Sequence, residues 1–199
     1  MKDFGESNDK LREFELSALG YIDSLFNVAM RMTRNREEAE DLIQETYLKM
    51  HRFSHTFNKD SNLKAWLFKI LRNTFINLFR KKIREPQVVN YGDAEDFYLF
   101  NKITNKRKDD SLPGESVLSL EEFLEDEVKN ALENLPLVFK EVVLYSDIEG
   151  LTYEEISDVI GCPIGTVKSR LYRARKQLQN SLWSYAKDRG YVNETLGNK

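Results

Sequence analysis

Two stretches of the chain combine many cationic side chains with no acidic ones, a pattern that suits the binding of phosphate groups. The first stretch spans residues 61–84 and the second spans residues 163–179. Between them, residues 93–127 are rich in Asp and Glu, so the formal net charge of −3 hides a segregated distribution. Because phosphate binding responds to the local field, the total charge does not exclude a nucleic-acid ligand.

Signals for two helices joined by a sharp turn follow one another from residue 152 to residue 163. Thr152 and Glu155 have the spacing of a capping box, in which each side chain bonds the backbone N–H of the other residue. Gly161 suits a sharp turn, and Pro163 suits the first turn of a new helix, where its missing N–H costs nothing. The pattern predicts a short capped helix, a turn and a second helix.

The second of these helices is predicted to be apolar on one side and small, polar and basic on the other. Its apolar side comprises Val167, Leu171, Ala174 and Leu178. At about 100° per residue, the opposite side comprises Gly165, Thr166, Ser169, Tyr172, Arg173 and Lys176. Such a helix fits the major groove of DNA. An ordinary solvated helix is the alternative, but it would interleave Glu with its Lys residues.

Residues 150–156 (GLTYEEI) and 165–175 (GTVKSRLYRAR) closely resemble region 4 of the sigma-70 family, in particular its extracytoplasmic-function branch. In that family, region 4 is a helix-turn-helix that recognises the −35 promoter element. The resemblance implies −35 contacts from Gly165, Thr166, Lys168, Ser169, Arg170, Arg173 and Lys176. A helix-turn-helix alone would also suit a transcriptional regulator that binds duplex operator without polymerase. The N-terminal half is therefore needed to distinguish a sigma factor from such a regulator.

Residues 39–50 (AEDLIQETYLKM) resemble region 2.2 of the same family, which docks on the clamp coiled coil of RNA polymerase. On a helix, Leu42, Ile43, Thr46 and Met50 would face inward, and a polar side would remain outside. The residues alone favour an ordinary solvated helix face. The resemblance instead implies a polymerase-binding surface made of Asp41, Gln44, Glu45 and Lys49.

Residues 63–81 (LKAWLFKILRNTFINLFRK) resemble regions 2.3 and 2.4, which bind and open the −10 promoter element. That task needs cations for the phosphates and a site for bases that leave the stack. The resemblance assigns −10 contacts to Lys64, Lys69, Arg72, Asn73, Arg80 and Lys81. It also places the pocket for an extruded base in the preceding loop, residues 54–61. Trp66 suits a place in the core as well as a stacking role.

The elements that must position these residues are predicted to be all helical, because the 199 residues include only 9 Gly and 4 Pro. We expect an all-α fold with two small domains, a region 2 helical bundle and a region 4 helix-turn-helix, joined by a flexible linker. Ser61 is a candidate N-cap for the helix that follows it, and Pro86 should end the first domain. The expected domains are residues 17–85 and 120–185, with a linker over 86–119 and a tail over 186–199.

Other classes of function find little support in the sequence. His51 and His55 are spaced like metal ligands, but no Cys or catalytic Glu nearby completes a site. The single Cys162 allows no internal disulfide, and no secretory signal or membrane span is apparent, so we expect a cytoplasmic protein. We predict no enzymatic activity, metal, cofactor or small-molecule substrate. An RNA-processing factor with a basic surface remains a weaker rival.

The partners expected from the resemblance are core RNA polymerase, promoter DNA and an anti-sigma protein. On the polymerase, the family binds the clamp coiled coil of the beta-prime subunit and the flap of the beta subunit. The predicted function is that of an extracytoplasmic-function sigma factor, which directs promoter-specific initiation of transcription.

Overall fold

The computed structural model describes residues 3–84 and 126–192, and these residues form helices with no strand among them. The expected all-α fold with two helical regions is confirmed. The predicted linker over residues 86–119 lies outside the described residues, and so does the aromatic run at residues 97–100. None of the described helices is long and apolar enough to cross a membrane.

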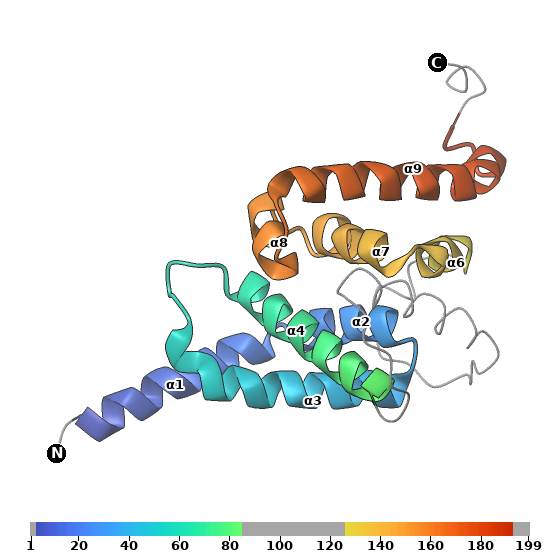
Figure 1. The fold of residues 1–199 in the computed structure, drawn as a ribbon. Coiled ribbons are helices and arrows are strands. Elements are labelled where there is room, and N and C mark those ends of the chain that lie inside the picture. The colour runs from blue at the N-terminus through green and yellow to red at the C-terminus, as the bar shows by residue number, and fades with distance from the viewer. Residues whose placement is uncertain (1–2, 85–125, 193–199) are drawn as a thin grey trace.

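The N-terminal module, residues 3–84, contains four α-helices and a short 3-10 turn. These are α1 (Asp3–Leu19), α2 (Ile22–Thr33), α3 (Arg36–Phe53), η1 (Ser54–Thr56) and α4 (Leu63–Arg84). The polar start of the chain gave no sign of α1. As Figure 1 shows, α4 crosses the layer formed by α1, α2 and α3 and lies on the side nearest the rest of the molecule.

Capping explains where the helices of this module begin and end. Asn35 caps α3, because its side chain accepts a hydrogen bond from the backbone N–H of Glu38 at 3.0 Å. The prediction that Ser61 caps α4 is wrong. Asn62 takes this role, since its Oδ1 accepts from the N–H of Lys64 at 2.9 Å. The Ser61 hydroxyl instead donates to the carbonyl of Asn58 and stabilises the preceding loop.

The C-terminal module, residues 126–192, contains α6 (Asp126–Asn134), α7 (Leu137–Val143), a π-helical turn η3 (Leu144–Ile148), α8 (Tyr153–Ile160) and α9 (Ile164–Asp188). The predicted capping box is confirmed, because Thr152 and Glu155 each bond the other's backbone N–H, at 3.2 and 2.8 Å. Gly161 follows α8 with φ of 72°, a left-handed conformation that disfavours residues with a Cβ. These features fix the angle at which α9 leaves the turn.

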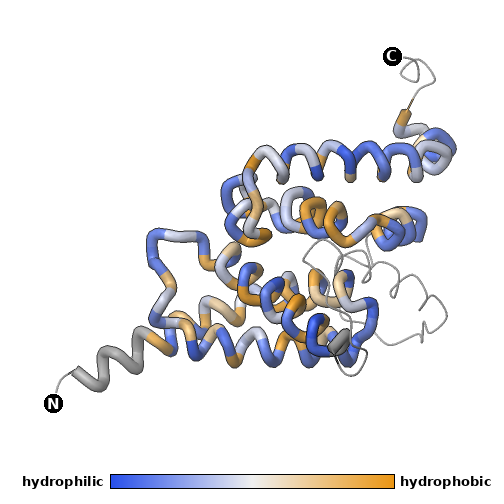
Figure 2. Tube along the Cα trace, in the orientation of Figure 1, coloured by the Kyte–Doolittle hydropathy of each residue, from blue (hydrophilic) through white to orange (hydrophobic). Residues whose placement is uncertain are grey.

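The two modules pack against each other, and their buried residues form one continuous core. The contact is made mainly by α4 against α8, and single side chains of α4 also reach α7 and η3. Its centre is aromatic, since the rings of Phe68 and Tyr145 lie 5.4 Å apart and both residues are fully buried. We call this packing the closed arrangement. Figure 2 shows that apolar residues concentrate between the layers, whereas much of α9 is hydrophilic.

Candidate nucleic-acid interface

The side of α9 that faces away from α7 forms an exposed basic surface. Its back is anchored by Val167, Leu171 and Ala174, each at most 2% exposed. The exposed front comprises Gly165, Lys168, Ser169, Tyr172, Arg173 and Lys176, with Thr166 half-buried beside them. Tyr172 is 69% exposed, which is unusual for an aromatic side chain. The helix therefore has the apolar back and polar front that its sequence predicted.

Gly165 leaves open space at the start of this surface. A Cβ placed there would meet no heavy atom within 4 Å, and the residue has ordinary helical geometry. The fold itself therefore does not require a glycine, although glycine in a helix costs about 1 kcal/mol relative to alanine. A bare backbone at this point allows close approach by a ligand.

Two arginines on α9 turn away from the front and bind carboxylates. Arg170 is half-buried, and its guanidinium lies 3.8 Å from Glu141 of α7. Arg175 donates through Nε to Asp147 of η3 at 3.1 Å. Arg170, a member of the predicted −35 set, therefore has its charge matched by an acid of the same module.

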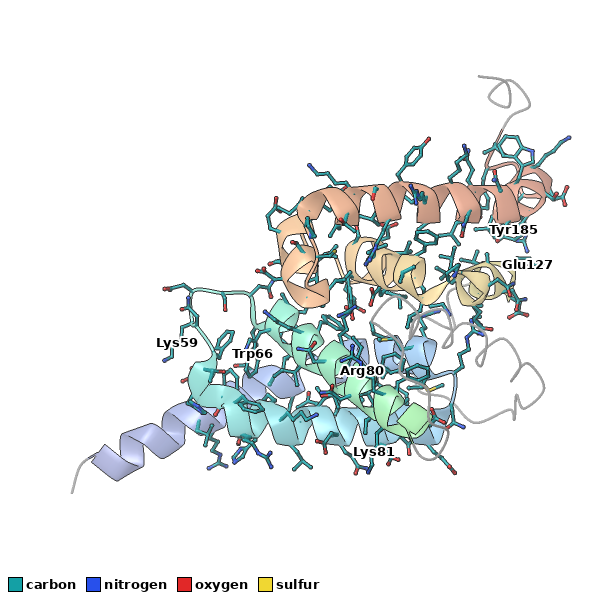
Figure 3. The ribbon with its side chains drawn as sticks, in the orientation of Figure 1. Lys59, Trp66, Arg80, Lys81, Glu127 and Tyr185 are labelled. Atoms are coloured by element: carbon teal, nitrogen blue, oxygen red, sulfur yellow. The ribbon has the colours of Figure 1, made fainter. Side chains whose placement is uncertain are left out.

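The predicted −10 residues on α4 divide into two groups. Lys69, Asn73 and Lys81 are exposed, and Arg80 is half-buried. Figure 3 shows Arg80 and Lys81 toward the C-terminal end of the helix. Lys64 and Arg72 instead face the C-terminal module, where they form ion pairs with Glu149 and Glu141, both at 2.8 Å.

Glu141 is the most buried charged residue at this contact. Its side chain is 1% exposed and accepts from Arg72 through both Nε and Nη2, at 2.8 and 3.4 Å. Burial raises the pKa of Glu141, while Arg72 and Arg170 oppose that shift. A carboxylate held in this way depends on its arginine partners to remain charged inside the protein.

Cationic side chains cluster at the other end of the contact between the two modules. Lys140, 3% exposed, donates weakly to the carbonyls of Glu133 and Arg31, at 3.2 and 3.5 Å. Arg34 donates to the same Glu133 carbonyl. Burial lowers the pKa of Lys140 to about 7, and the charges of Arg34 and Arg31 lower it further while Glu133 raises it. Among the described residues, Nη2 of Arg31 is buried without a hydrogen-bond partner.

An aromatic cluster supports the loop between α3 and α4. The rings of Phe14, Phe57 and Trp66 lie 5.3 to 5.8 Å from one another. Trp66 is half-buried and packs against the core, which gives it a structural role in this arrangement. In Figure 3 Lys59 lies on the loop itself and Trp66 at the start of α4.

The outer side of α3 is mostly polar. Leu42, Thr46 and Met50 are buried, as predicted. Of the four predicted polymerase-binding residues, Asp41 and Gln44 are exposed and Glu45 and Lys49 are half-buried. The last two form an ion pair at 3.4 Å.

Leu48 lies on the same outer side and is 64% exposed. Leu48 was not among the residues predicted from the sequence, although its position outside the buried stripe of α3 was a usable signal.

Comparison with known proteins identifies this combination of modules. A family model described as Sigma-70 region 2 matches residues 20–85, and one described as Sigma-70, region 4 matches residues 125–178. The ECF RNA polymerase sigma factor EcfG of Rhodopseudomonas palustris is 36% identical over 176 residues, which cover 88% of this chain and 86% of that protein. The chain belongs to the extracytoplasmic-function sigma factors of RNA polymerase.

Other similar proteins agree with this assignment. The RNA polymerase sigma-H factor of Pseudomonas aeruginosa is 32% identical over 173 residues, which cover 86% of each chain. Among solved structures, the sigma factor RpoE of Bartonella quintana, in complex with the anti-sigma factor NepR, matches with a TM-score of 0.66 and 31% identity. That match covers 86% of this sigma factor and 98% of the RpoE chain.

As a sigma factor, the protein binds core RNA polymerase and promoter DNA and directs the initiation of transcription. The function predicted from the sequence is confirmed, and nothing in these comparisons favours a regulator that acts without polymerase. The described residues contain no group of three or more His, Cys, Asp or Glu side chains that could hold a metal ion. His51 instead lies 2.6 Å from Glu15.

Proposed function

We propose that the exposed front of α9 reads the −35 element in the major groove. The observation that carries this proposal is a helix surface with basic, hydroxyl and aromatic side chains and no acid, set on a buried apolar back. Arg173 is exposed and central, so it is suited to a guanine edge, while Lys168 and Lys176 are suited to phosphates. Arg170 would join them once its contact with Glu141 is released.

In the same proposal, α4 and the loop before it bind the −10 element. Lys69, Asn73 and Lys81 are exposed and so are free to meet the DNA backbone. Lys64 and Arg72 would contribute only after leaving their carboxylate partners. The loop over residues 54–61 is largely exposed and stands on the aromatic cluster, which suits a pocket for a base that leaves the stack.

We further propose that the outer side of α3 docks on the clamp coiled coil of the beta-prime subunit. Asp41, Gln44 and Glu45 offer polar contacts, Lys49 stays paired with Glu45, and Leu48 offers an apolar anchor beside them. The C-terminal module would bind the flap of the beta subunit. Two attachments to polymerase leave the basic surfaces of α4 and α9 available to DNA.

An anti-sigma protein is the remaining partner that we propose. The support is the RpoE structure, whose sigma factor is in complex with the anti-sigma factor NepR and resembles this chain over most of its length. In this proposal the protein acts in the cytoplasm, without a cofactor and without catalysing a reaction of its own.

The test is transcription with purified core polymerase that lacks any sigma factor and a library of promoter fragments. We expect specific initiation that depends on this protein. As a matched control, a variant with Arg173→Ala and Lys176→Ala should bind core polymerase normally but fail to select promoters. Tight binding to duplex DNA without association with core polymerase would overturn the proposal and favour an operator-binding regulator.

A further inference from the structure

Glu141 contacts both surfaces that the proposed function assigns to DNA. Its carboxylate binds Arg72, from the −10 surface, at 2.8 Å. The same carboxylate lies 3.8 Å from Arg170, from the −35 surface. One buried acid therefore neutralises an arginine of each module.

The surrounding contacts repeat this pairing of N-terminal donors with C-terminal acids. Lys64 donates to both the carboxylate and the backbone carbonyl of Glu149, each at 2.8 Å. At the edge, Asn62 donates to Glu155 at 2.7 Å. The C-terminal module thus presents anionic groups to α4 where, under the proposed function, α4 would meet DNA.

Promoter geometry is incompatible with this arrangement. The −35 and −10 elements are named for positions about 25 base pairs apart, or roughly 85 Å of B-DNA at 3.4 Å per base pair. In the closed arrangement, Arg72 and Arg170 lie within 3.8 Å of one carboxylate. DNA bending by tens of degrees does not remove such a difference. The modules have to separate before they can contact both elements.

We propose that the ion pairs of Glu141 with Arg72 and of Glu149 with Lys64 form an autoinhibitory latch, which holds the free sigma factor closed and hides part of the −10 surface on α4. This inference rests on the proposed function for its consequence, but the latch itself is a property of the free chain. Opening exchanges the carboxylates of Glu141 and Glu149 for DNA phosphates as partners of the same cations.

The cations at the far end of the contact make the latch releasable. Lys140, Arg31 and Arg34 approach one another there, and Lys140 and Arg34 share one backbone carbonyl as acceptor. Like charges in a buried site oppose its formation. The closed arrangement thus combines favourable ion pairs at one end with unfavourable repulsion at the other, so a partner of moderate affinity can open it.

The experiment measures the distance between the modules in the free, full-length protein by pulsed electron resonance. Spin labels are placed at Glu37→Cys in α3 and Ser181→Cys in α9, both exposed, in a Cys162→Ser background. We expect one short distance for the unmodified latch and a longer, broader distribution for Glu141→Gln. The matched control is Asp147→Asn, which breaks an ion pair within the C-terminal module and should leave the distance unchanged.

A second set of variants covers the case in which Glu141→Gln lowers the helical content. Lys64→Glu and Glu149→Lys should each lengthen the distance, and the two together should restore it. Glu141→Gln should also raise the affinity of the free protein for a −10 DNA fragment roughly tenfold, if the open state is about one-tenth populated.

The results separate the latch from the proposed function. Unchanged distances in both sets of variants, or a long distance before any substitution, would overturn the latch. A lengthened distance with unchanged DNA affinity would keep the latch and refute its role in hiding DNA-binding residues. Transcription with core polymerase tests the proposed function independently.

Discussion

Tyr145 packs its ring against Phe68 across the boundary of the two modules, while its hydroxyl is buried without a hydrogen-bond partner among the described residues. A buried hydroxyl in this position costs free energy, because it has lost its bonds to water. The ring of Tyr145 therefore stabilises the contact between the modules, and its hydroxyl oxygen reduces that stabilisation.

Tyr145→Phe should consequently raise the free energy of unfolding by about 1 kcal/mol, measured by urea denaturation. Tyr47→Phe is the matched control, because the Tyr47 hydroxyl donates to the carbonyl of Ala18 at 2.8 Å. That variant should lose about 1 kcal/mol. A Tyr145→Phe protein less stable than the parent would show that the hydroxyl has a partner after all.

The stability of the closed protein should rise between pH 7 and pH 9. The pKa of Lys140 is lowered to about 7 in the folded protein, from an ordinary value of 10.5. In this window the unfolded chain binds more protons than the folded one, so the free energy of unfolding increases with pH, by about 2 kcal/mol in total. Arg31, Arg34 and Glu133 are the charged groups that act on this ammonium.

Lys140→Met should flatten this dependence, as measured by urea denaturation at several pH values. The raised pKa of Glu141 acts in the opposite direction, because stability falls as pH rises above 4.5 toward the folded pKa of that carboxyl. An equal slope for the parent protein and Lys140→Met would assign the pH dependence to other groups.

Arg173→Ala should weaken binding to the −35 element by about 1–3 kcal/mol while affinity for core polymerase stays unchanged. The reason is that Arg173 is exposed at the centre of the front of α9, whereas the proposed clamp-binding residues lie on α3. Binding is measured by fluorescence anisotropy with duplexes that carry single base changes. Loss of polymerase affinity in this variant would contradict the separation of the two surfaces.

Lys81→Ala should reduce the salt dependence of promoter binding by about one unit in the slope of log affinity against log salt. Lys81 is exposed near the end of α4, so it is placed for a phosphate contact. Lys129→Ala, on α6, serves as the control because Lys129 lies 3.7 Å from Asp126 within its own helix. Equal slopes for the two variants would mean that Lys81 contacts no phosphate.

Leu48→Ala should weaken the complex with core polymerase and leave stability almost unchanged. The side chain is 64% exposed, so its removal creates no cavity in the core. We expect a loss of roughly 1–2 kcal/mol in polymerase affinity if Leu48 anchors the contact. Arg12→Ala, at an exposed position of α1 outside that surface, is the comparison. Native gel titration with core polymerase provides the measurement.

Local signals in the sequence predicted the C-terminal module well. The capping box at Thr152, the turn at Gly161 and the apolar spacing from Val167 all act over a few residues, and the structure contains each of them. The cap of α4 was misassigned because Ser61 and Asn62 are both good N-cap residues, and only the backbone geometry distinguishes them.

The pairing of the two modules could not be predicted, because it joins residues far apart in the chain. Arg72 and Glu141 are 69 positions apart, and each looks like an ordinary surface charge in its own helix. The sequence does reveal that basic and acidic segments alternate, but it does not reveal which carboxylate meets which cation. Leu48 and α1 were not predicted for a different reason, because neither continues an apolar stripe.

The open space at Gly165 means that packing inside the protein does not require a glycine at this position. Gly165→Ala would fit the helix and improve its intrinsic helix propensity. The variant should therefore fold as well as the parent protein. Under the proposed function, a methyl group would nevertheless stand where the DNA approaches the start of α9. In that case the glycine lowers the stability of the helix slightly but leaves space for a ligand.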